Sequence, residues 1–171
     1  MRQGGGKAKG LAFERQTCRA LSSWLTAGLD PNQLIWSIGS GGWRSKEEGE
    51  EGWRQVGDLA PNGDAGERFR RRFAVECKHR RAIDFWHTFT AKPGENLHGW
   101  WLKLCSECAP YDGLKPMLVV KANNKPTVVG VPGLELLIPT AIVLQYEGEC
   151  RAAFVPLTEL VRLDPEEVLN L

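Results

Sequence analysis

Three residues near the middle of the sequence could do metal or acid–base chemistry together: Asp58, Glu76 and Lys78. Side chains two apart on a β-strand point the same way, so Glu76 and Lys78 would share a face and Cys77 would take the other. Two carboxylates side by side repel unless a cation intervenes, and a hard ion such as Mg²⁺ takes oxygen ligands. A bound metal acidifies water, and a neighbouring amine can orient that water.

The alternative for these three residues is a surface group held in weak, ordinary ion pairs. The run Phe73–Lys78 argues against it, because the strand otherwise looks buried and unpaired ions are costly there. Glu14 is a second sign, since it stands on the apolar row of a helix formed by Leu11, Cys18 and Leu21. Its carboxylate either reaches solvent or an arginine, or adds a ligand to the same cluster.

These residues need a scaffold that brings them together. We expect an opening helix over 9–27 that ends near Gly28, a strand over 34–38 and a mobile acidic loop over 39–52. Strands over 53–60 and 69–78 would pair as an antiparallel hairpin through the Asn62-Gly63 turn, which would lay Asp58 beside Glu76. The later elements expected are a helix over 99–109, strands over 116–121, 127–131, 141–146 and 151–155, and a helix capped by Asp164.

Charge points to a polyphosphate partner, although the chain as a whole carries only +1. Residues 68–81 hold seven Lys and Arg but one acid, which is either a solvated face or a surface for nucleic acid. Residues 1–9 look like a flexible basic arm. Trp100 and Trp101 could stack on bases but are more typical of a core. The expected DNA contacts are Lys7, Lys9, Arg70, Arg72, His79, Arg80 and Arg81.

Five short motifs together resemble the archaeal-type Holliday junction resolvases of the PD-(D/E)XK nuclease superfamily over roughly residues 7–131. They are Lys9-Gly10 with Phe13-Glu14, Ser37-Ile38-Gly39-Ser40-Gly41, Gly57-Asp58-Leu59, Val75-Glu76-Cys77-Lys78, and Met117-Leu118-Val119-Val120-Lys121 after a helix. The chain departs from the family in three places. Gly57 replaces the usual proline, the loop over 42–52 is longer and more acidic, and residues 132–171 match nothing in the family pattern.

The resemblance implies a metal site of Glu14, Asp58 and Glu76, with Lys78 as the catalytic lysine. It also implies a hydroxyl from Ser40, or alternatively Ser37, near the scissile phosphate. The cofactor would be Mg²⁺, with Mn²⁺ able to substitute, and the partner a branched DNA bound by a homodimer.

We therefore expect one α/β, restriction-endonuclease-like domain over 1–171. It would have a central mixed sheet flanked by helices, and a C-terminal extension over 132–171 of unknown role. Its expected function is metal-dependent hydrolysis of DNA, resolving four-way junctions in recombination or repair. A restriction-type, nicking or repair nuclease and a non-catalytic DNA-binding module are the alternatives. We expect a cytoplasmic protein whose five cysteines are reduced thiols. Cys105 and Cys108 are either buried small side chains or half of a zinc site.

Overall fold

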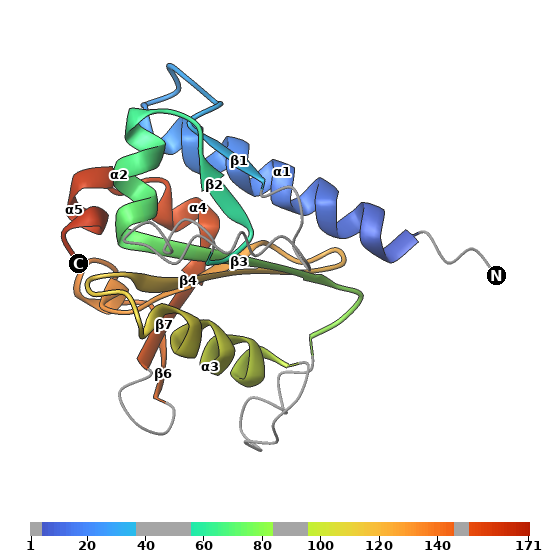
Figure 1. Cartoon of the computed structure of the whole chain (residues 1–171). Coiled ribbons are helices and arrows are strands. Elements are labelled where there is room, and N and C mark those ends of the chain that lie inside the picture. The colour runs from blue at the N-terminus through green and yellow to red at the C-terminus, as the bar shows by residue number, and fades with distance from the viewer. Residues whose placement is uncertain (1–4, 37–55, 84–95, 146–150) are drawn as a thin grey trace.

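The structure is a computed structural model that describes residues 5–36, 56–83, 96–145 and 151–171 (Figure 1). Its centre is a five-stranded mixed sheet in the order β3-β4-β5-β7-β6, in which only β3 and β4 run parallel. The bounds are β3 Phe73–Arg80, β4 Lys115–Ala122, β5 Val128–Val131, β6 Ile142–Gln145 and β7 Arg151–Pro156. A separate antiparallel ribbon joins β1 (Leu34–Trp36) to β2 (Leu59–Pro61).

Helices cover both faces of the sheet, which confirms the expected α/β class. Helix α3 packs on one face around Trp101, while the other helices lie on the opposite face with α1 (Figure 1). Side chains along β3 alternate between the two faces of the sheet, so the strand contributes to both cores. Val75 and Cys77 pack in the α1 core, whereas Ala74 packs in the α3 core. The helices are α1 Gly5–Leu25, α2 Asp64–Arg72, α3 Leu97–Cys108, the 3₁₀ turn η3 Leu134–Leu136, α4 Leu157–Leu160 and α5 Pro165–Leu169.

The opening helix is present and stops where the sequence indicates, with Gly28 in the left-handed region at φ +86°. It begins earlier than expected, at Gly5. Residues 5–9 are therefore helical and not part of a flexible arm, and residues 1–4 lie outside the described residues. The helix buries Leu21 and Trp24, and the Trp24 indole N–H donates to the carbonyl of Leu163 at 2.8 Å.

The expected hairpin between residues 53–60 and 69–78 is wrong. Residues 64–72 form helix α2, and β2 pairs with β1 instead of β3, with Ala60 opposite Ile35. Three features favour the helix: Asp64 and Glu67 in its first turn, arginines in its last turn, and the ring of Phe69 buried beneath it. The Asn62-Gly63 pair leads into this helix rather than turning the chain between two strands.

The start of α2 is capped by a residue from another element. The side-chain oxygen of Gln33 accepts from the backbone N–H groups of Ala65 at 3.0 Å and Gly66 at 3.3 Å. Gly66 is needed for that approach, because a Cβ there would lie 1.8 Å from the carbonyl oxygen of Gln33. The cap holds the segment after Asp58 against the segment before β1.

The C-terminal extension is an integral part of the sheet. Strand β7 lies between β5 and β6, and Leu134, Leu160 and Val168 are fully buried in the α1 core. Asp164 caps α5 as expected, its carboxylate accepting from the N–H of Glu166 at 2.9 Å. The β4–β5 hairpin is also confirmed, with Asn124 in the left-handed conformation at φ +58°.

Candidate active site

Asp58 is fixed against the outer edge of β3, where none of the described strands pairs, by two hydrogen bonds to the backbone of that strand. Its N–H donates to the carbonyl of Val75 at 2.7 Å, and its Oδ2 accepts from the N–H of Cys77 at 2.7 Å. The side chain is only 7% exposed. Although the expected hairpin does not form, Asp58 reaches the strand that carries Glu76 and Lys78 by this different route.

Gly57 makes this approach possible. It adopts φ +84°, and a Cβ at that position would lie 2.4 Å from the carbonyl oxygen of Val75. Proline holds φ near −65° and could not take this conformation. The glycine that stands where the resemblance expects proline is therefore required by the local backbone, and it lets Asp58 come close to β3.

Glu76 and Lys78 share one face of β3 and form an ion pair there, as the strand spacing predicts. Both side chains are largely buried, at 13% and 22% exposure. Cys77 points to the other face, into the core beside α1, and burial raises the pKa of its thiol well above the ordinary value. That thiol is therefore packed and protonated, on the other face of the strand from the Glu76–Lys78 ion pair.

Glu14 on α1 lies near enough to this group to interact with it electrostatically. Burial raises the pKa of its carboxyl, the charge of Glu76 raises it further, and the charge of Lys78 opposes both. Its neighbour Arg15 is occupied elsewhere, with the guanidinium 4.3 Å from the centre of the Trp36 ring. The acid that looked out of place in the apolar row is thus half-buried and within electrostatic reach of Glu76 and Lys78.

The three carboxylates and the ammonium form one electrostatic group. The pKa of Asp58 is raised to about 7, mainly because the carboxyl is buried and secondly because Glu76 is close. Lys78 lowers it and Glu14 raises it. A buried carboxyl that binds protons this readily, beside another acid, is what a hard divalent cation would neutralise.

This donor set fits a divalent ion held by one or two carboxylates and otherwise by water and phosphate, as Mg²⁺ commonly is. Asp58 is suited to the role because Oδ2 is used by Cys77, while Oδ1 makes no hydrogen bond to the described residues. Within that described part of the chain, no three His, Cys, Asp or Glu side chains form a ready metal cage.

Polar and basic residues surround the end of β3 beyond Lys78. The side-chain oxygen of Asn123 accepts from Lys9 at 3.0 Å and lies 3.1 Å from His79 Nε2. The His79 ring packs on Phe13, one residue before Glu14, with centroids 5.4 Å apart. This cluster of Lys9, His79 and Asn123 ties α1 to the ends of β3 and β4.

Three other residues that were expected to contact DNA are also described by the structure. Arg80 lies over Trp100 at 5.2 Å, Arg81 is exposed just after β3, and Lys7 is exposed on α1. Asn123 was recognised from sequence only as a turn residue. Its link to Lys9 and His79 depends on contacts between segments far apart in the chain.

Arg70 does not belong to a nucleic-acid surface, which corrects the expectation. It is fully buried, and its guanidinium donates to the carbonyl oxygens of Phe73 and, at 2.5 Å, Val56. Burial lowers its pKa to about 10. The expectation placed the three consecutive arginines on a strand. They lie on helix α2 instead, and Arg70 is the one enclosed by the core, where its guanidinium donates hydrogen bonds to backbone carbonyls.

Other sequence expectations are settled or lie outside the described residues. Ser37 and Ser40, with the loop over 39–52, fall outside them. Trp100 and Trp101 are buried in the α3 core, so the core interpretation is confirmed over base stacking. Cys108 is buried in the same core, where desolvation raises the pKa of its thiol to about 12.

Comparison with known proteins finds one family. The profile of a family described as "phage putative PDDEXK endonuclease" matches residues 5–145, which include all four residues of the candidate site. Comparison with curated proteins and with solved structures found no match. None of the described helices is both long and apolar enough to cross a membrane.

Proposed function

Because this chain belongs to the PD-(D/E)XK endonuclease family, with a restriction-endonuclease-like fold, we propose that it cuts DNA at the group of Glu14, Asp58, Glu76 and Lys78 with a divalent metal ion. The observation that carries the proposal is their convergence from three separate segments. Burial and mutual charge raise the proton affinity of Asp58 and Glu14 as expected for carboxylates that share a cation.

Each side chain then has a role that its position supports. Asp58, locked by the N–H of Cys77, presents its second oxygen as a ligand, and Glu76 adds a carboxylate from β3. A divalent ion there would acidify a water molecule and neutralise charge on a phosphoryl oxygen. Lys78, held by Glu76, would orient the attacking water and donate to the phosphate. Glu14 would support the same cluster from α1.

The finer parts of the proposal are Mg²⁺ as the ion, with Mn²⁺ as a substitute, a homodimer, and four-way or other branched DNA as the substrate. They are supported by the motifs shared with archaeal-type junction resolvases. Lys9, His79, Arg80 and Arg81 would hold the phosphates that flank the cut, because they lie at the end of β3 that follows Lys78.

The test compares Glu76→Ala and Lys78→Ala with the wild-type protein on labelled DNA in Mg²⁺. We expect cleavage to fall by at least about a hundredfold while binding is kept, since the lost groups act on the reaction. Lys103→Ala and Glu107→Ala are matched controls, because they break another Lys–Glu ion pair on the exposed side of α3. Unchanged turnover in either site variant would remove the proposed site.

A panel of substrates tests the finer proposal. Four-way junction, flap, plain duplex and single strand are compared at equal concentration, with chelator and with Mg²⁺ or Mn²⁺ added back. Preference for the junction supports resolution, preference for duplex or single strand supports the restriction or repair alternative, and tight binding without cleavage supports a DNA-binding module. Sedimentation of the free protein measures whether it is a dimer.

A further inference from the structure

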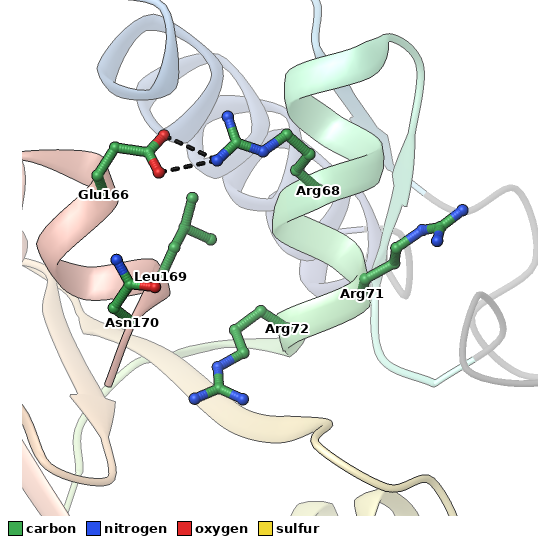
Figure 2. A pocket seen from close by; sticks show the side chains of 6 residues that line it. All are labelled: Arg68, Arg71, Arg72, Glu166, Leu169 and Asn170. Carbon is green, nitrogen blue, oxygen red and sulfur yellow. Dashed lines mark hydrogen bonds and ion pairs between the residues drawn. The ribbon is translucent and has the colours of Figure 1, made fainter.

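A second group of cations lies at the other end of β3, away from the candidate active site. Figure 2 shows a shallow pocket between α2 and α5, of about 320 Å³, lined by Arg68, Arg71, Arg72, Glu166, Leu169 and Asn170. Arg72 directly precedes β3, whereas Glu76 and Lys78 lie further along that strand. At about 3.3 Å per residue, the six residue steps from Arg72 to Lys78 span roughly 20 Å.

Helix geometry places two of these arginines together. Arg68 and Arg72 are four residues apart on α2, so both project on the α5 side, while Arg71 points away from Glu166 (Figure 2). Like charges at this spacing repel each other modestly, and an anion between them would relieve that repulsion. Glu166 is the one carboxylate among the six lining residues, and it binds Arg68 at 2.8 Å and 3.0 Å.

Arg72 is left with unused donors. One guanidinium nitrogen donates to the carbonyl of Gly113 at 3.3 Å, and its Nε is buried without a hydrogen-bond partner among the described residues. Lys115 is a further cation close by, since Arg72 adds to burial in lowering the pKa of its ammonium. Its Nζ donates to the main-chain oxygen of Leu171. The C-terminal end of α2 favours cations, but it supplies no charged partner for them.

We propose that this pocket binds a phosphate group of nucleic acid between Arg68 and Arg72, and that Glu166, which pairs with Arg68, competes with that phosphate until DNA arrives. A phosphodiester matches the forked donors of arginine. The six lining residues include no aromatic ring to hold a base, and the pocket is shallow, so it would read a backbone and not a nucleotide. The inference extends the proposed function and rests on it: the substrate would contact the protein at both ends of β3.

The experiment measures binding of a fluorescent DNA duplex in chelator at several salt concentrations. Arg68→Ala with Arg72→Ala should weaken binding by about fivefold and reduce the salt slope by about one for each phosphate that the variant no longer neutralises. Glu166→Gln should tighten binding by roughly twofold to threefold, because it removes the competing carboxylate. A gain of affinity cannot arise from misfolding.

The pair formed by Arg162 and Glu159 supplies the matched controls. It is an exposed ion pair at 2.7 Å in the same C-terminal region but outside the pocket. Glu159→Gln changes the net charge by one unit, as Glu166→Gln does, and Arg162→Ala removes one of the two charges lost in the pocket arginine variant; both controls should leave DNA affinity within about twofold of wild type. Equal effects of Glu159→Gln and Glu166→Gln, or wild-type affinity in both pocket variants, would overturn the inference.

Two further measurements distinguish this inference from a site for free phosphate and from the nuclease proposal. Inorganic phosphate is titrated against the same variants; if they alter phosphate binding but leave DNA binding unchanged, the nucleic-acid assignment is wrong. Cleavage is measured in parallel at saturating DNA. Binding changes as expected with no cleavage by the wild-type protein would uphold the pocket and reject the nuclease proposal, whereas normal cleavage with unchanged binding would reject the pocket alone.

Discussion

Asp58 and Cys77 are joined by a 2.7 Å hydrogen bond from the backbone N–H of Cys77 to Oδ2 of Asp58. Strand β3 is the edge of the sheet, so the N–H groups on its outer side have no neighbouring strand to bond among the described residues. An acidic side chain takes the place of that strand. The carboxylate is therefore held beside β3 by a main-chain N–H group, which side-chain substitutions on the strand would leave in place.

Replacing Glu14 by Gln should separate its function from its packing. The carboxyl is partly buried near Glu76, and removing its charge relieves repulsion, so we expect the melting temperature to stay the same or rise. Cleavage should fall strongly, by about tenfold or more, if the carboxylate supports the metal. Thermal unfolding and single-turnover cleavage are measured on the same preparation. A lower melting temperature with full specific activity in the folded fraction would make Glu14 structural.

Asp58 should make the metal-free protein less stable as pH rises. Its pKa is about 7 in the folded chain and near 3.8 when unfolded, so between these values the folded state binds more protons. Stability contributed by the proton is present below about pH 4 and is lost progressively up to about pH 7. Melting temperatures in chelator over that range should fall for the wild type and fall less for Asp58→Asn. Parallel curves for the two proteins would contradict the raised pKa.

Gly57 should tolerate no side chain. In Gly57→Ala the methyl group would lie 2.4 Å from the carbonyl oxygen of Val75 at a φ of +84°, so we expect a loss of at least about 1 to 3 kcal/mol in stability. Gly10→Ala on α1 is the control, since nothing lies within 4 Å of its Cβ position. That change should stabilise the helix by about 0.5 to 1 kcal/mol. Urea denaturation of both variants measures the contrast.

Arg70 should be needed for folding and not for binding. Truncation to Ala removes the donors to the Phe73 and Val56 carbonyls in a fully buried place, and we expect a loss of about 3 to 5 kcal/mol. Arg68→Ala, on the exposed side of the same helix, should change the melting temperature little. If Arg70→Ala melted like the wild type yet bound DNA weakly, the buried arginine would have to be reassigned to the surface.

Sequence reasoning recovered the placements that depend on short-range geometry. The shared face of Glu76 and Lys78 follows from the two-residue period of a strand, and the half-buried position of Glu14 follows from the helical period of α1. The α/β class and the β4–β5 hairpin were recovered for the same reason. None of these required knowledge of which distant segments meet.

What sequence reasoning missed depends on contacts between distant segments. Helix α2 was missed because Asn62-Gly63 is a strong hairpin signal, and the consecutive arginines do not show that Arg70 is buried. The cap that fixes α2 comes from Gln33, on a segment remote in the chain. The left-handed Gly57 could be judged only once Val75 was seen against it. Charge placement at the two ends of α2 was the available signal for the helix.

The insertion of β7 between β5 and β6 has a practical meaning for work on this protein. The family match stops at residue 145, directly after β6, yet β6 touches the sheet solely through β7 among the described strands. A fragment trimmed at that boundary would leave β6 without its neighbouring strand and open the Val129 and Val131 side of the core. Expression and screening should therefore keep residues up to 171, even though sequence similarity ends well before them.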